Sequence, residues 1–178
     1  MILTFRNIHP DIDKSVFIAD GAVVIGDVVI EKDSSVWFNA VIRGDVHYIR
    51  IGQRTNIQDG CILHVTNSKN YLEIGDDVTI GHNAVIHGCI VKSNILIGMG
   101  SVILDRAIIS SNSIIAAGSV VKEGTIVPEG VLAAGVPARI MRDLRGEEIT
   151  RIKESAEGYV NYSKEYLELK SIHLKISD

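Results

Sequence analysis

Residues 97–127 read IGMGSVILDRAIISSNSIIAAGSVVKEGTIV, and an aliphatic side chain returns in this stretch at every sixth position. The same interval extends back to Ile18, with two interruptions, and forward to Ala133. A small or β-branched residue follows most of these anchors four positions later. Because side chains alternate faces along a strand, an anchor and the residue four places later point to the same side. The period therefore predicts short strands joined by tight corners and stacked as a parallel β-helix. The anchors are Ile18, Val24, Ile30, Val36, Ile42, Ile51, Ile57, Leu63, Ile74, Ile80, Ile86, Val91, Ile97, Ile103, Ile109, Ile115, Val121, Val127 and Ala133.

The composition suits such a narrow prism. Of the 178 residues, 46% are apolar but only 5% are aromatic, as expected for a core of thin aliphatic layers. The length is typical of one domain with a small appendage. A β-sandwich of short strands is the main alternative, but a sandwich does not hold one period of six across about 115 residues.

Charge and hydropathy limit the partners. The chain has 18 basic and 22 acidic residues, a net charge of −4, and no basic cluster, so we expect no nucleic-acid partner. No signal-peptide pattern is visible at the N-terminus. The most apolar window, residues 95–104, is far shorter than a membrane span, so we also expect no membrane association. The two cysteines, Cys61 and Cys89, cannot form a disulfide framework, and we expect a reduced, cytoplasmic setting.

The repeat resembles that of the hexapeptide-repeat proteins, whose coils have three sides, about 18 residues per turn and a left-handed path. The resemblance implies an all-β fold, a single-stranded, left-handed parallel β-helix, which we assign to residues 1–140. From Glu147 to about Lys170 the apolar spacing changes to that of an amphipathic helix, although Gly158 weakens it. We therefore expect residues 141–178 to form a C-terminal helix that packs along the prism.

Two interruptions of the repeat are candidate functional positions. Three extra residues lie between Ile42 and Ile51, and five lie between Leu63 and Ile74. In a three-sided count both insertions leave from the same side of the prism. The residues that follow three successive anchors on that side, Arg43, His64 and His87, should stack in a column with about 4.8 Å per rung.

Three of the six histidines suggest a metal site. His9, His47 and His173 have no partners by pattern, and we interpret them as surface or loop residues. In contrast, His64, His82 and His87 converge near one edge. Neutral imidazole suits zinc, and three protein ligands with one open position are typical of a catalytic site. Cys61 falls at an inward-facing small position and is expected to fill the core.

His82 places a geometric demand on this site. It lies five residues before His87, roughly 16 Å of extended chain around the prism, and should face elsewhere. Zinc needs every ligand nitrogen at about 2.0–2.1 Å, which one chain can hardly supply. In a three-fold homotrimer, His82 of one subunit could complete the site of the next. We therefore predict a metal site that exists only in the oligomer.

The motifs match a known family. Val41-Ile-Arg-Gly-Asp45, Asn56-Ile-Gln-Asp59, His64, Ile80-Gly-His-Asn-Ala-Val-Ile-His-Gly-Cys89 and Ile97-Gly-Met-Gly100 resemble the gamma-class carbonic anhydrases and their bacterial relatives. The resemblance covers residues 10 to 170, nearly the whole chain. It implies a homotrimer with zinc, or iron or cobalt, between subunits, and reversible hydration of carbon dioxide to bicarbonate by metal-bound hydroxide.

The resemblance also assigns residue roles. The metal ligands would be His64, His82 and His87. Arg43 and Asp45 would form an interface ion pair near the metal, with Asp59 close by; a purely structural ion pair is the alternative. Gln58 and Asn56 would orient the hydroxide and the substrate, and Arg43 could attract the anion.

One feature departs from the family. Its best-studied members transfer the proton through a glutamate in an acidic loop beside the first histidine. The corresponding segment here, Val65-Thr-Asn-Ser-Lys-Asn-Tyr71, has no carboxylate. Proton release should therefore be slow, or use His47 or buffer.

Other functions stay open. The Ala134-Gly-Val-Pro-Ala138 segment also occurs in hexapeptide acyltransferases, which use one histidine as general base and need no metal trio. A metal-dependent thioester hydrolase is a related possibility. A non-enzymatic alternative is an accessory or assembly protein that keeps the metal for structure.

Overall fold

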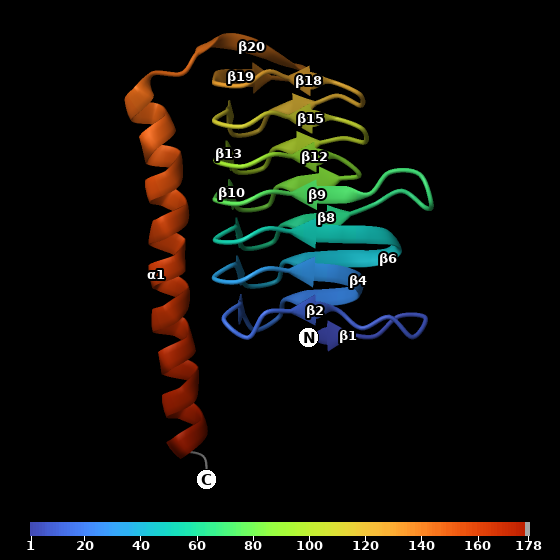
Figure 1. Cartoon of the computed structure of the whole chain (residues 1–178), viewed down its shortest axis with the longest axis vertical. Coiled ribbons are helices and arrows are strands. Elements are labelled where there is room, and N and C mark those ends of the chain that lie inside the picture. Colours follow the sequence, from blue (N-terminus) through green and yellow to red (C-terminus); the bar gives the residue numbers. More distant parts are fainter. Residues whose placement is uncertain (177–178) are drawn as a thin grey trace.

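The computed structural model describes residues 1–176, with only the helical backbone described for residues 170–176. The chain forms a three-sided, left-handed parallel β-helix followed by one long helix (Figure 1). In chain order the elements are β1 (Ile2–Leu3), β2 (Asp11–Ile12), β3 (Phe17–Ile18), β4 (Val23–Ile30), β5 (Ser35–Val36), β6 (Val41–Ile51), β7 (Asn56–Ile57), β8 (Ile62–His64), β9 (Leu72–Ile74), β10 (Val78–Ile80), β11 (Val85–His87), β12 (Ile90–Val91), β13 (Ile95–Ile97), β14 (Val102–Ile103), β15 (Ile108–Ile109), β16 (Ile114–Ile115), β17 (Val120–Val121), β18 (Ile126–Val127), β19 (Val131–Gly135), β20 (Ala138–Asp143) and α1 (Gly146–Ile176).

The strands form three parallel ladders. One contains β8, β11, β14, β17 and the first halves of β4 and β6; we call its outer surface the histidine face. The second contains β9, β12, β15, β18 and the second halves of β4 and β6, which turn the corner without a break. The third runs from β3 to β20, and its last pair, β19 with β20, is antiparallel and ends the repeat.

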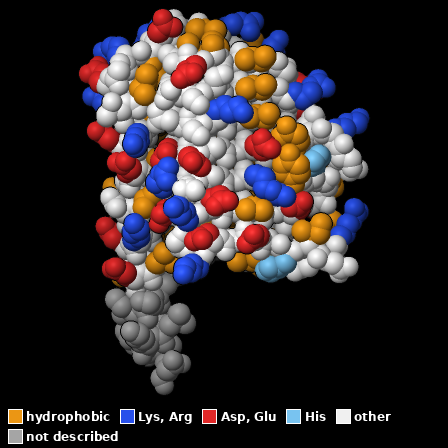
Figure 2. Space-filling view, viewed as in Figure 1, with side chains coloured by type: hydrophobic (Ala, Val, Ile, Leu, Met, Phe, Trp, Pro, Cys, Tyr) orange, Lys and Arg blue, Asp and Glu red, His pale blue; other side chains and the backbone are white. Residues whose placement is uncertain are grey.

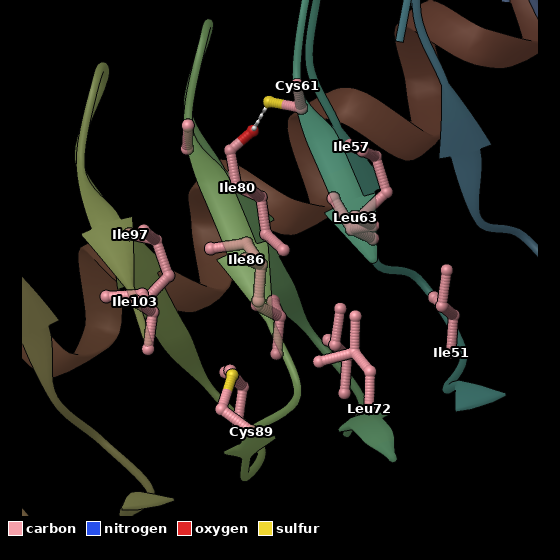
Figure 3. Packing of buried hydrophobic residues seen from close by; sticks show 14 of the residues in the cluster. Ile51, Ile57, Cys61, Leu63, Leu72, Ile80, Ile86, Cys89, Ile97 and Ile103 are labelled. Atoms are coloured by element: carbon pink, nitrogen blue, oxygen red, sulfur yellow. Dashed lines mark hydrogen bonds between the residues drawn. The ribbon is translucent and has the colours of Figure 1, made fainter. Parts of the chain in front are cut away.

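The core has the layers that the repeat predicts. Every anchor except the half-buried Ile18 is buried, and Ile57, Leu63, Ile80, Ile86, Ile97 and Ile103 stack in successive coils inside the prism (Figure 3). Cys61 is also fully buried, as expected, and its Sγ atom lies 3.1 Å from the carbonyl oxygen of Gly81.

The first interruption of the repeat is not a loop. Its extra residues belong to β6, and the pairing with β4 shifts register from Gly26–Gly44 to Val28–Ile49. A Cβ atom on Gly44 would lie 2.6 Å from the carbonyl oxygen of Asp27, so only glycine allows the two strands to approach this closely. The second interruption is a loop, residues 65–71, which projects between β8 and β9 (Figure 1).

Helix α1 runs back along the third ladder (Figure 1). It begins at Gly146, later than the predicted residue 141, because β20 extends to Asp143 and pairs with β19. Ile152, Ala156 and Ser163 are buried against the prism, whereas Figure 2 shows acidic and basic side chains on the outer side of the helix. Tyr166 packs edge-on against Trp37, with ring centroids 5.2 Å apart. In the described part of the chain, this helix lacks the apolar stretch that crossing a membrane requires. Residues 177 and 178 of the predicted helical segment lie outside the described residues.

Candidate metal centre

Two of the predicted ligands face each other across adjacent strands. His64 ends β8 and His87 ends β11, and the two residues are direct partners in the ladder. The Nδ1 atom of His64 lies 3.1 Å from the Nε2 atom of His87. Two nitrogens that coordinate one tetrahedral zinc at about 2.0–2.1 Å are about 3.3 Å apart. The pair therefore fits two ligands of one metal ion.

The outer nitrogen of each ring contacts a carboxylate. His64 Nε2 lies 3.1 Å from Asp45 Oδ1, and His87 Nδ1 lies 2.5 Å from Asp105 Oδ1. A carboxylate accepts, so each ring donates outward, and the two inner nitrogens turn lone pairs toward each other. A metal ion between the rings would satisfy both lone pairs, and carboxylate partners are the usual outer contacts of metal-bound histidines.

Burial of His64 favours the neutral form of its ring, which is the form that binds metals. The pKa of His64 accordingly lies below its ordinary value. Burial raises the pKa of Asp45, but hydrogen bonds from Arg43 and His64 outweigh it, and the pKa lies below its ordinary value. Arg43 Nη1 lies 2.5 Å from Asp45 Oδ2, so the predicted Arg43–Asp45 pair exists within one protomer.

The other predicted residues gather elsewhere, around His82. This histidine lies in the turn after β10, and its Nδ1 atom is 2.8 Å from Asp59 Oδ2. Its backbone N–H donates to Gln58 Oε1 at 3.2 Å, and Gln58 Nε2 donates to Asn56 Oδ1 at 3.1 Å. Asn56 is buried and donates to Thr79 Oγ1 at 2.9 Å. Asn56, Gln58 and Asp59 thus accompany His82, and not the His64–His87 pair.

One protomer presents two partial sites. Among residues with described side chains, no three His, Cys, Asp or Glu groups are placed to hold a metal ion together. The first partial site has two facing imidazoles, and the second has one imidazole with a carboxylate on Nδ1 and Nε2 left for another partner.

The remaining histidines have separate environments. His9 Nδ1 lies 2.9 Å from Thr4 Oγ1. His47 Nδ1 accepts from the backbone N–H of Tyr48, and this residue lines a cavity of about 220 Å³ together with Asp45. The side chain of His173 lies outside the described residues.

Asp105 is a site residue that sequence analysis did not identify. It follows His87 by one coil, in the segment after β14, and reaches back along the prism axis. Its Oδ2 atom accepts from Thr66 Oγ1 at 2.6 Å and from Asn70 Nδ2 at 3.1 Å. The sequence signal for this contact is the spacing of 18 residues from His87, which equals one coil of the prism. A single aspartate at a corner does not by itself indicate a site.

The histidine face carries an aliphatic column beside the metal centre. The residue before each anchor on this face is aliphatic, and consecutive members pair in register. They are Val23, Val41, Ile62, Val85, Val102 and Val120. All are partly solvent-accessible, and Ile62 is 39% exposed.

The fold and this pair of partial sites define a hexapeptide-repeat protein with a candidate metal centre. A carbonic anhydrase from Geobacillus kaustophilus is 49% identical over 178 residues, 100% of this chain and 97% of the relative. A probable carbonic anhydrase from Methanocaldococcus jannaschii is 54% identical over 154 residues, 86% of this chain and 96% of the relative. A solved structure described as a putative acetyltransferase from Bacillus cereus has a TM-score of 0.92 at 42% identity, covering 94% of this chain and 97% of its own.

No family model matches the chain. The identities over nearly full length nevertheless show the relationship: the chain belongs to the gamma-carbonic-anhydrase-like family of hexapeptide-repeat proteins.

Proposed function

We propose that the protein is a zinc-dependent, carbonic-anhydrase-like enzyme that hydrates carbon dioxide reversibly at the subunit interfaces of a homotrimer. Iron or cobalt would suit the same ligands. The observation that carries the proposal is the pair of inner nitrogens of His64 and His87, 3.1 Å apart, with a carboxylate on each outer nitrogen. The names of the two relatives support the reaction.

The metal would supply the nucleophile, because bound zinc lowers the pKa of its water to about 7. The protein would supply the ligands and their orientation. Asp45, Asp59 and Asp105 each accept from one histidine and thereby fix the ring and its tautomer. Arg43 is partly exposed beside Asp45 and provides a positive charge that favours the bicarbonate anion.

The separation of the ligands within one protomer supports a site shared between subunits of a homotrimer. One protomer supplies His64 and His87 from one edge, and a second would supply His82, with Gln58 hydrogen-bonded to its backbone. Gln58 would then orient the oxygen nucleophile, and Asn56 would orient Gln58. The aliphatic column on the histidine face supports a covered surface, since a continuous apolar strip at a surface is typical of an interface.

Metal content measured together with stopped-flow carbon dioxide hydration tests this function. The wild-type trimer should bind about one zinc per subunit interface and hydrate carbon dioxide, and His82→Ala should lose both properties. Equal hydration by both proteins would contradict the mechanism. Bound zinc without hydration at any buffer concentration would indicate the accessory or assembly role instead.

Acyl transfer is the second candidate, because the Bacillus cereus structure is described as a putative acetyltransferase. A transferase would use one histidine as general base and keep its activity after removal of zinc by a chelator. Acyl-thioester turnover by the chelated protein would favour this candidate, whereas thioester hydrolysis that is lost on chelation and restored by zinc would favour a thioester hydrolase.

A further inference from the structure

Asp105 makes hydrogen bonds to two parts of the molecule at once. Its Oδ1 atom lies 2.5 Å from His87 Nδ1, and its Oδ2 atom accepts from Thr66 and Asn70. Thr66 and Asn70 are the two ends of the 65–71 loop, and their backbones form an antiparallel bridge. One carboxylate therefore connects a predicted metal ligand to both ends of the loop.

The loop has few other polar attachments to the prism. The backbone N–H of Ser68 donates to the carbonyl oxygen of Val46 at 3.2 Å. Asn67, Ser68 and Lys69 at the tip are exposed. The side-chain hydrogen bonds that Thr66 and Asn70 donate to Asp105 are accordingly the main polar restraint on the two ends of the loop.

The bond between Asp105 and His87 depends on the tautomer of His87. With a metal ion between the rings, both inner nitrogens act as ligands, so the proton of His87 must be on Nδ1, where it is donated to Asp105. A bound metal ion would thus fix the ring of His87, and with it the carboxylate that accepts from Nδ1. Without a metal ion, this restraint on the ring, and through Asp105 on Thr66 and Asn70, is absent.

We propose that Asp105 is a positioning residue that couples metal occupancy at His87 to the order of the 65–71 loop through Thr66 and Asn70. The inference rests on the proposed function, because it assumes that His87 binds the metal. It goes beyond that function because it assigns a role to the loop. The loop has no carboxylate of its own, and Asp105, from a later coil of the prism, accepts its hydrogen bonds. Zinc binding should therefore order the loop.

Limited trypsin digestion provides the test, since Lys69 is exposed at the tip and cleavage requires the loop to open. Mass spectrometry of the 1–69 fragment reports cleavage at this residue alone. In the wild-type protein, saturating zinc should slow this cleavage at least about tenfold. The double variant Thr66→Val/Asn70→Ala keeps the Asp105–His87 contact, so it should bind zinc and lose the protection.

Asp105→Asn should lose the protection as well, and its zinc affinity should fall about 10- to 100-fold, as is usual when an outer partner of a metal ligand is removed. Glu123→Gln is the matched control, because Glu123 is an exposed carboxylate that pairs with Arg106. It should behave as wild type. Light scattering shows whether each zinc-loaded variant is trimeric. A loss of protection in a trimeric variant is then caused by the loop contacts and not by dissociation.

Equal zinc protection of Lys69 in the double variant and the wild type would overturn the inference. Zinc binding to the wild type without any protection of Lys69 would overturn it too, and would leave the proposed function intact. Failure of the wild-type protein to bind zinc would instead contradict the proposed function, and the inference with it.

Discussion

Asp45 Oδ1 lies 3.1 Å from His64 Nε2, on the side of the imidazole opposite His87. Asp45 belongs to the corner of β6, where three extra residues are taken up without a loop. The first interruption of the repeat therefore positions the carboxylate that orients the first predicted ligand. Both interruptions of the repeat are therefore connected to the histidine column by hydrogen bonds: the first through Asp45 and His64, and the second through Asp105 and His87.

Replacing Ile62 by glutamate should dissociate the trimer without unfolding the prism. Ile62 is in the middle of the aliphatic column of the histidine face and is 39% exposed. Covering a charge there without a partner would be strongly unfavourable. Light scattering should report monomers while circular dichroism is retained.

Ile126→Glu is the control for that experiment. Ile126 is 66% exposed and belongs to β18, in the second ladder, which does not contribute to the histidine face. This variant should remain trimeric. Dissociation by Ile126→Glu, or a trimeric Ile62→Glu protein, would assign the interface to another face.

Removing one aliphatic layer below the histidine column should lower stability. Ile86 is fully buried and immediately precedes His87. Ile86→Ala should reduce the free energy of unfolding by about 2–5 kcal/mol through lost burial and a new cavity. Urea denaturation measures the change, and a cost close to zero would show that the rung is loosely packed.

The cysteines should not react in the native protein. Burial raises the pKa of the Cys61 thiol to about 11, and burial also raises the pKa of Cys89. Because the thiolate is the reactive form, neither residue should be modified by a thiol reagent at neutral pH. Both should react after unfolding in guanidinium, and rapid modification of the native protein would contradict the buried positions.

The contribution of Asp105 to stability should depend on pH. Burial raises the pKa of Asp105, but hydrogen bonds from Thr66, His87 and Asn70 outweigh it and hold the pKa below its ordinary value of 3.8. A depressed folded pKa stabilises the protein above the unfolded value, and the contribution is lost as the pH falls through the folded value. The stability difference between metal-free wild type and Asp105→Asn should therefore be largest near pH 6–7 and shrink below about pH 4. A difference that grows toward acid pH would be inconsistent with this environment.

The prism could be predicted from its repeat, because the anchor pattern depends only on strand alternation. His64 and His87 could be placed in one column for the same reason, since both follow an anchor on the same side. Asp105 was not identified, because its contact to His87 crosses between coils through a corner, where the period places no restraint on side-chain direction. The burial of Asn56 could not be predicted either, because it depends on the packing of α1 against the third ladder. Asn56 donates to Thr79, and the Oγ1 atom of Thr79 lies 3.3 Å from the Oγ atom of Ser155 in α1.

A metal site shared between subunits can be tested by mixing two inactive variants. His64→Ala and His82→Ala would each lose the metal as homotrimers, because each lacks one ligand at every interface. After the two are unfolded together and refolded in equal amounts, about one quarter of all interfaces should combine an intact His64–His87 pair with an intact His82. Zinc bound per interface and carbon dioxide hydration should then recover to about one quarter of the wild-type values. Mixed trimers that recover neither zinc nor hydration would contradict a site shared between subunits.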